Sequence, residues 1–454
     1  MENKKNLYKQ LVIVGLPITL QCLMQSLLPI VDELMVGQLS ENAIASITVG
    51  NRIYSIFYFI IMALVGATSI YVTQLWGSKK KESIEKAFKI PFLVGLFTLF
   101  IYLFVAFFLP TQSVSLFASE SDIIRTSAMV QKIYALSAVP VFFSCMFQTV
   151  LRSTKHVKAP MVCGIVSVIM NTILNAVFIF GFAFIPAMGF VGAAIATLLA
   201  RIIEALLLAG FVYISNRHEF KFNIFRILTL KVDAQFKKAY CHTMFPLLLM
   251  NVMFAVADTV YSVIYGQMGA DAIAAISIMF PIQGFSIGLF NGMASASAII
   301  LGNELGEKHI DTAISFSKSI VRVTTVLSIA ISAVLAGFSQ VYVSMYNVSE
   351  QVQFYSLMLV LVSAFYLTFK VLNMVISQGI IQCGGETKFV LLLDIIGPWC
   401  VGIPLALLGT FVLDLPVYIV FAMLTMEELV RIVLGFYKYR KFEWATNIVS
   451  DIKV

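Results

Sequence analysis

Long apolar segments follow one another along the whole chain. A helix needs about 20 apolar residues to cross the hydrocarbon core of a bilayer, and twelve segments reach that length. Only 12% of the 454 residues are charged and 60% are hydrophobic, so no separate soluble domain can be assigned. The sequence therefore predicts an all-α, multi-pass protein of the lipid bilayer, with spans at 11–37, 44–75, 89–110, 123–150, 159–182, 188–214, 241–267, 272–301, 316–339, 352–382, 388–411 and 415–437.

The connections between these segments alternate in charge. Lys and Arg residues collect at the N-terminus, in the connections after the second, fourth and sixth spans and in the tail. Neither occurs in the connections near Glu41, Glu120, Pro186, Asp271, Glu350 and Asp414. Positively charged loops of this kind stay on the cytoplasmic side. We therefore expect a cell (plasma) membrane protein whose two termini and central connection, 215–240, are cytoplasmic. The net charge of +7 arises in these loops and does not indicate a nucleic-acid partner.

The central connection separates two similar halves. When the chain is shifted by 229 positions, several Pro, Gly, Gln and Lys residues coincide. Because each half has six spans, the two copies lie parallel in the membrane, which is typical of transporters with a substrate path at the repeat interface. We predict an N-terminal lobe at 1–214, a linker at 215–240 and a C-terminal lobe with a tail at 241–454. The matched pairs include Pro17 with Pro246, Gly37 with Gly266, Gly77 with Gly306 and Lys79 with Lys308.

One carboxylate lies well inside the first span. A charge at the position of Asp32 is costly unless it faces a protein interior or a water-filled cavity, so Asp32 is a candidate functional residue. Gln25 lies seven residues earlier, on the same helical face. The neighbouring Glu33 more simply ends the helix at the interface. Arg52 in the second span could pair with Asp32 or Glu33, which would weaken the case for an ion site.

The second half has charged residues within its own spans. A lysine in mid-membrane, such as Lys370 in the tenth span, needs a carboxylate or water beside it. We expect Lys370 to face the lobe interior and to pair with Asp394 or Asp258, either in a functional charge network or as a fixed structural pair. The twelfth span adds Glu427, Glu428 and Arg431.

Several stretches are similar to one transporter family. They are LRSTKHVKAP at 151–160, MNTILNAVFIFG at 170–181, GFVGAAIATLLAR at 189–201, PIVDELMVGQL in the first span and GGETKFVLLLD at 384–394. These stretches, which span the full length and occur along the chain in the order expected, resemble the multidrug and toxic compound extrusion (MATE) family. The resemblance implies two pseudo-symmetric six-helix lobes around a central cleft. It also implies an antiporter, not an enzyme, that exports organic, often cationic drugs or metabolites by alternating access in exchange for protons or sodium ions.

The resemblance also implies an ion-coupling site in the N-terminal lobe. It assigns Asp32, Asn171, Asn175 and Thr197 to this site, and Gln25 shares the face of Asp32. Carboxylate, amide and hydroxyl oxygens suit a hard cation, so Asp32 and Asn175 would be sodium ligands if sodium is the coupling ion. One branch of the family has an Asp at the position of Asn175, and this chain therefore has one charge less there. The two Asn side chains could instead form interhelical hydrogen bonds only.

The resemblance does not extend to the chemistry of the C-terminal lobe. Lys370 stands in the span where the best-known branch of the family has an Asp. The C-lobe carboxylates of that branch therefore cannot be assigned to residues of this chain. For the substrate, Tyr54 and Phe57 in the second span could hold a flat organic cation by cation–π contact. Most of the 38 Phe residues are expected to face lipid or the core.

Two other functions compete with drug export. A flippase of the same superfamily for lipid-linked precursors usually has extra spans and a more cationic cleft, which this sequence does not indicate. An intramembrane enzyme commonly uses His or paired acids, but neither HExxH nor a GxxxxGK[ST] phosphate loop occurs. We expect a monomer with no cofactor other than the transported proton or sodium ion. The four His residues, all in or near loops expected to be cytoplasmic, are His156, His218, His242 and His309.

Overall fold

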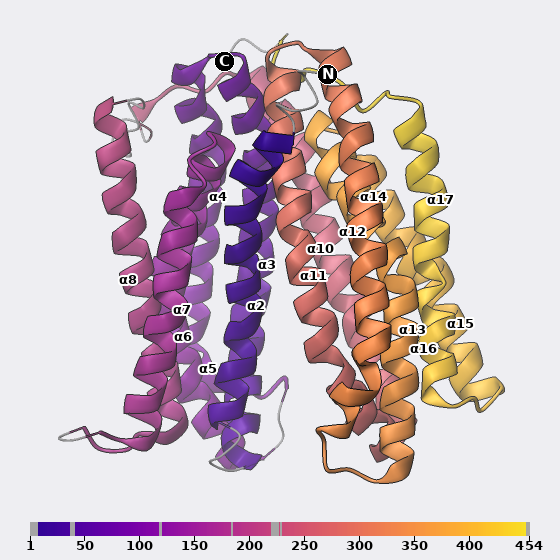
Figure 1. Ribbon diagram of the computed structural model, residues 1–454. Helices are drawn as coiled ribbons and strands as arrows, with labels where there is room; N and C mark the ends of the chain where they lie inside the picture. Colours follow the sequence, from indigo (N-terminus) through magenta and orange to yellow (C-terminus); the bar gives the residue numbers. More distant parts are fainter. Residues whose placement is uncertain are drawn as a thin grey trace. The chain divides into compact units, whose positions relative to one another are not determined.

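A computed structural model of the chain describes residues 8–36, 41–117, 120–182, 185–218, 227 and 229–450 (Figure 1). These residues form helices, apart from turns and one isolated antiparallel bridge between Phe182 and Ile185. The α-helices of the first half are α2 (Leu16–Val36), α3 (Glu41–Gly77), α4 (Lys81–Phe108), α5 (Pro110–Val114), α6 (Ser121–Ser153), α7 (Lys158–Phe180) and α8 (Gly189–His218). Those of the second half are α10 (Ala234–Gln267), α11 (Ala270–Gly306), α12 (Ile310–Ser344), α13 (Glu350–Met374), α14 (Thr387–Ile395), α15 (Ile403–Leu407), α16 (Val417–Thr425) and α17 (Glu427–Arg440).

In the described residues, four π-helical segments and one 3-10 turn interrupt the α-helical pattern. They are η1 (Leu11–Gly15), η2 (Val375–Ile381), η4 (Ile396–Gly402) and η5 (Leu408–Val412), with η3 (Gln382–Gly384) as the 3-10 turn. A π turn inserts an extra residue into a helix and so rotates all the faces that follow it. The side chains after η2 and η4 therefore point in directions that regular helical spacing does not give.

Eleven helical stretches in the described part of the chain are long and apolar enough to cross a membrane. The remaining predicted span, 415–437, forms the consecutive helices α16 and α17, which meet at Met426. α17 begins with Glu427 and Glu428, so this region has no uninterrupted apolar stretch of membrane length. The all-α, multi-span fold expected from the sequence is confirmed.

The internal repeat appears in the turns that end α3 and α11. Lys79 and Lys308 occupy equivalent positions, and both have left-handed backbone conformations, with φ of 59° and 64°. In both turns the lysine N–H bonds to the carbonyl three residues back, at 3.0 and 3.1 Å. The next N–H bonds to the carbonyl five residues back, at 3.1 and 3.0 Å. This pair of bonds is the Schellman pattern of helix ends, which usually has Gly at that position.

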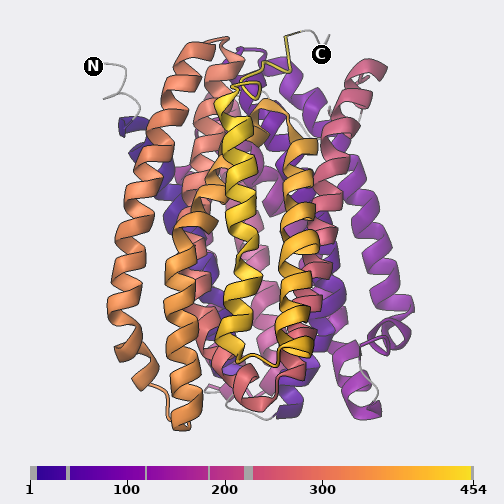
Figure 2. The same ribbon diagram turned by 90° about the vertical axis from the view of Figure 1, so that its right-hand side faces the viewer.

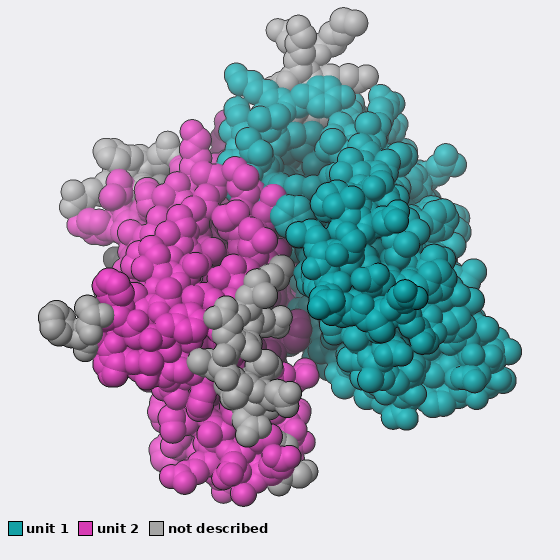
Figure 3. Space-filling view, turned by 60° about the horizontal axis from the view of Figure 1, so that its bottom comes forward, with its two compact units in different colours: residues 1–19, 245–450 teal, residues 20–244, 451–454 magenta. Residues whose placement is uncertain are grey.

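Contacts divide the chain into two compact units (Figure 3). Unit 1 comprises residues 1–19 and 245–450, and unit 2 comprises 20–244 and 451–454. In unit 2, Phe57, Phe88 and Phe142 are part of one buried core. In unit 1, a separate core includes Met279, Leu359 and Val420. The lobe boundaries and the central cleft expected from the sequence stay predictions.

The last described residues of the chain fold back onto unit 1. In this unit α13 and α17 lie side by side (Figure 2). Beyond α17, Trp444 is fully buried, and Thr446 Oγ1 donates to the carbonyl of Gly384 at 2.7 Å. Asn447 Nδ2 donates to the carbonyl of Leu305 at 2.7 Å, near the end of α11. The tail is therefore tied to the ends of both helical stretches, and the Leu305 carbonyl accepts a second hydrogen bond beside the one from the Lys308 N–H.

Candidate functional site

Four polar side chains from three helices form one hydrogen-bonded chain in unit 2. Asp32 Oδ1 on α2 accepts a hydrogen bond from Asn175 Nδ2 on α7 at 2.5 Å. The same nitrogen donates to Asn171 Oδ1, one turn earlier on α7, at 3.0 Å. Asn171 Nδ2 then donates to Thr197 Oγ1 on α8 at 3.3 Å. The structure thus brings together the four residues that the family resemblance assigned to ion coupling.

The two Asn side chains of this site are isolated from solvent. Asn171 is 1% exposed and Asn175 is 0% exposed. Asn175 Oδ1 is buried and accepts no hydrogen bond from the part of the chain that the structure describes. An unsatisfied buried acceptor costs about 1–3 kcal/mol. An acceptor oxygen of this kind beside the carboxylate of Asp32 is suited to a cation, and the carboxylate alone can also take up a proton.

Local packing explains why α7 and α8 meet at this level. Asn171 and Asn175 are four residues apart, so they lie on one face of α7. A Cβ on Gly192 of α8 would lie 2.4 Å from the carbonyl oxygen of Phe178 on α7, so only glycine allows this approach. The close contact brings Thr197 within hydrogen-bond distance of Asn171.

The other residues expected around Asp32 are not part of this hydrogen-bonded chain. Gln25 is half-buried on α2 and makes no hydrogen bond to the four residues within the described ranges. Arg52 is exposed on α3, and the described residues contain no ion pair between it and Asp32. The Glu33 side chain lies outside the described part of the structure.

Unit 1 contains a buried charge cluster centred on Arg431 of α17. The Arg431 guanidinium pairs with Asp394 of α14, and its Nη1 lies 3.7 Å from Glu428 Oε2. Asn373 Nδ2 on α13 donates to the same Glu428 oxygen at 2.7 Å. The side chains of Arg431, Asp394 and Glu428 are 17%, 15% and 4% exposed. One guanidinium therefore compensates two carboxylates from two helices.

The carboxylate next to this cluster has a different partner. Glu427 Oε2 accepts a hydrogen bond from the Tyr261 hydroxyl of α10 at 2.6 Å. Gly402 at the end of η4 lies against this pair, and a Cβ there would be 2.5 Å from the Tyr261 hydroxyl oxygen. A side chain at 402 would therefore displace the Tyr261 hydroxyl or the Glu427 carboxylate from this hydrogen bond.

The expected pairing of Lys370 is not formed. Asp394 pairs with Arg431 instead, because α17 presents its guanidinium to α14. Asp258 is exposed on α10, and no ion pair joins it to Lys370 among the described residues. Lys370 is within electrostatic range of Glu427, without a direct ion pair in the described part of unit 1. Asp258, Lys370 and Asp394 therefore do not form one network.

The two aromatic residues proposed for substrate binding are part of an aromatic cluster in unit 2. Phe57 is 2% exposed and stacks on Tyr102 with ring centroids 5.2 Å apart. Tyr54 is half-buried and lies 5.8 Å from Tyr134, centroid to centroid. In this conformation Phe57 offers no free ring face, whereas Tyr54 is partly exposed.

A second hydrogen-bonded network in unit 2 was not predicted from the sequence. It joins Gln21 of α2, Gln148 of α6, and Glu204 with Arg201 of α8. Two signals were available in the sequence. Glu204 stands three residues after Arg201 in an apolar helix, and Gln21 stands four residues before Gln25.

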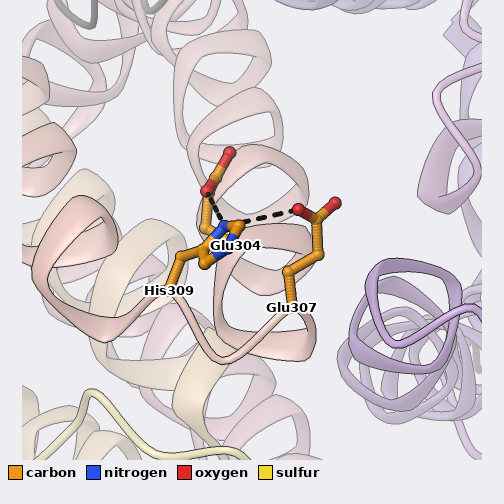
Figure 4. A group of neighbouring side chains, drawn as sticks. All are labelled: Glu304, Glu307 and His309. Atoms are coloured by element: carbon orange, nitrogen blue, oxygen red, sulfur yellow. Dashed lines mark ion pairs between the residues drawn. The ribbon is translucent and has the colours of Figure 1, made fainter.

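A group of two carboxylates and a histidine lies at the turn between α11 and α12. His309 Nδ1 lies 3.4 Å from an oxygen of Glu304 and 3.4 Å from an oxygen of Glu307 (Figure 4). The side chains of His309 and Glu307 are 57% and 40% exposed. Exposed acidic groups of this kind are common without any ion, so the group does not indicate a metal site.

Comparisons with known proteins give one consistent family. The MatE family model matches residues 17–177 and 246–408. The chain is 23% identical to the uncharacterized transporter YisQ of Bacillus subtilis, over 91% of the chain and 90% of that protein. It is also 23% identical to the probable multidrug resistance protein NorM of Bacillus cereus, over 89% of each.

A comparison with solved structures leads to the same family. The crystal structure of MATE in complex with MaL6 superposes with a TM-score of 0.87 and 17% identity, over 96% of both chains. Because the family model matches well over half of the sequence, in both halves, the chain belongs to the MatE family of multidrug and toxic compound extrusion transporters and is not an enzyme.

Proposed function

We propose that this transporter is a secondary active antiporter that exports small organic, often cationic compounds in exchange for protons or sodium ions. The observation that carries the proposal is the buried chain of Asp32, Asn175, Asn171 and Thr197. A carboxylate inside a span is costly unless it has a functional ligand or partner. The names of relatives such as the NorM protein of Bacillus cereus support a drug-like substrate.

The coupling ion would bind at Asp32. Because Asn175 is neutral, the four-residue site has one negative charge, which matches one proton or one monovalent cation. Binding would neutralise Asp32 and give Asn175 Oδ1 a partner. For coupling, the ion has to stabilise one conformation of the transporter more than the other. An ion gradient is the proposed energy source, since the sequence has no GxxxxGK[ST] phosphate loop.

The proposal is tested by imposing the two gradients separately on purified protein in lipid vesicles. One preparation has a proton gradient in sodium-free buffer, and the other a sodium gradient at equal pH on both sides. We expect at least one gradient to drive ethidium transport without ATP. Equal transport with no gradient, or transport only with ATP, would exclude secondary antiport.

We further propose that the protein is a monomer of the cell membrane with cytoplasmic termini. The alternating Lys and Arg content of the connections supports this orientation. In a variant without its native cysteines, Arg226→Cys should resist an impermeant maleimide applied outside intact cells and react once the cells are opened. Glu120→Cys, in a connection without Lys or Arg, is the matched control and should react from outside. Labelling of Arg226→Cys in intact cells would reverse the orientation.

A further inference from the structure

The second network of unit 2 ties α2 to α6 and α8. Gln21 Nε2 donates to Gln148 Oε1 at 3.0 Å, and Gln148 Nε2 donates to Glu204 Oε1 at 2.9 Å. Glu204 is also paired with Arg201, whose Nη1 lies 2.8 Å from Glu204 Oε2. Gln21 is 0% exposed and Glu204 is 1% exposed. These contacts are therefore interior features of unit 2, not surface pairs.

The second network and the candidate ion site both lie where α2 contacts α7, on the same face of each helix. Gln21 packs against Gly164 of α7, where a Cβ would lie 3.0 Å from Gln21 Cγ. Asp32 is bonded to Asn175 of the same helix. The two contacts are eleven residues apart on both helices, which is about three turns and returns to the same face. α2 stays helical through Pro29, three residues before Asp32, although proline removes one backbone hydrogen bond there. We therefore expect a shift of α2 at Gln21 to change the placement of Asp32.

α8 connects the same two levels. Thr197 and Glu204 are seven residues apart and so lie on one face of α8. Between them, the Ser167 hydroxyl of α7 donates to the carbonyl of Ala200 at 3.3 Å. Polar contacts thus join α2, α7 and α8 from Glu204 to Asp32.

The second network is only partly satisfied. Gln21 Oε1 and Arg152 Nε are buried, and neither has a hydrogen-bond partner within the described residues. Arg152 Nη2 reaches Gln148 Oε1 at 3.4 Å, the same oxygen that Gln21 uses. A half-satisfied buried network contributes little to stability, because the unpaired atoms offset the bonds that are formed. A contribution to stability therefore does not explain why these polar residues stand in the interior of unit 2.

We infer that Gln21, Gln148 and Glu204 are positioning residues that hold α2 in the register where Asp32 meets Asn175, and so set the affinity for the coupling ion. The inference rests on the proposed role of Asp32. None of the three residues touches the four-residue site by a hydrogen bond in the described structure. Their effect is therefore on the placement of Asp32 and not on its chemistry.

The test is the ion dependence of Gln21→Leu. Leu removes the donor to Gln148 together with the unpaired oxygen, so the folded yield should stay close to wild type. The half-saturating concentration of the driving ion should rise about tenfold, the size expected for the loss of one buried hydrogen bond. The half-saturating concentration of ethidium should stay unchanged. A purely structural role would lower yield and leave the ion dependence as it is.

Gln131→Leu is the matched control. Gln131 is also fully buried on α6, accepts one hydrogen bond from Ser113 at 3.1 Å and has an unpaired Nε2 within the described part of unit 2. It should not change the ion dependence. The double variant Gln21→Leu with Gln148→Leu should shift it no more than the larger single change, since both act through one chain.

Gly164→Ala tests the same contact without removing a polar group. The added methyl would meet Gln21 at 3.0 Å and should raise the half-saturating ion concentration, whereas Gly210→Ala on α8, with no atom within 4 Å, should not. Asp32→Asn is measured alongside. If it abolishes ion dependence while Gln21→Leu behaves like Gln131→Leu, the positioning inference alone fails. If Asp32→Asn leaves ion dependence intact, the proposed function and the inference fail together.

Discussion

Asp32→Asn is expected to abolish gradient-driven efflux while the protein still inserts and accumulates. Asn preserves the size of the side chain and its hydrogen bond with Asn175, which stands at 2.5 Å in the structure. It removes the negative charge that would bind a proton or sodium ion. Without differential ion binding, the gradient can no longer favour one conformation. The measurement is ethidium efflux in vesicles at matched protein amounts.

Asp122→Asn is the control for this change. Asp122 is an exposed residue in the first turn of α6, so the same chemical change there should leave efflux intact. Normal gradient-dependent efflux by Asp32→Asn at wild-type abundance would contradict the coupling role. Asp32 would then be a structural partner of Asn175 only.

Arg431→Met is expected to reduce the yield of folded protein more than any other single change in unit 1. The substitution leaves Asp394 and Glu428 without their shared cation in a nearly dry interior. Removing one partner of a buried pair costs about 3–5 kcal/mol, a large part of the stability of most proteins. Thermal unfolding of purified protein and membrane abundance would both measure the loss.

Two further variants make the interpretation specific. Arg431→Met combined with Asp394→Asn should recover part of the yield, because one uncompensated charge is removed. Lys370→Met should cost much less, because Lys370 has no direct ion pair with a carboxylate in the described residues. Equal damage by Lys370→Met and Arg431→Met would show that Lys370 is the cation that the cluster needs.

The spans could be predicted because each depended on a local pattern, and the shared helix face of Asn171 and Asn175 could be predicted for the same reason. The apolar segments predicted the order of the spans, eleven of which are helical stretches of membrane length in the described residues. The spacing of Asn171 and Asn175 placed both on one face. Asp32 was identified by its cost within a span. The family resemblance then supplied what spacing could not, which was the meeting of α2, α7 and α8 at this level.

The cluster in unit 1 could not be predicted in the same way. Lys370, Arg431 and Asp394 all lie in apolar spans, and the sequence gives no information on which cation faces Asp394. That choice depends on how α14 and α17 are rotated, and η4 begins directly after α14, two residues beyond Asp394. The hydropathy of the sequence gives no signal for a π-helical segment such as η4.

The hydrogen bonds of Gln21 and Glu204 were missed for a related reason. Each residue looks like an isolated polar side chain in an apolar helix, and their link through Gln148 exists only in three dimensions. The close packing of Gln21 against Gly164 could not be predicted either, because the sequence does not show which side chain packs against a glycine.

The central claim is that the coupling ion binds at Asp32. Its most direct test is equilibrium ion binding to purified protein, measured as radioactive sodium retained and as protons taken up when the pH is lowered. We expect wild type to bind one sodium ion or one proton more than Asp32→Asn, with Asp122→Asn like wild type. Identical sodium and proton binding by wild type and Asp32→Asn would contradict the claim.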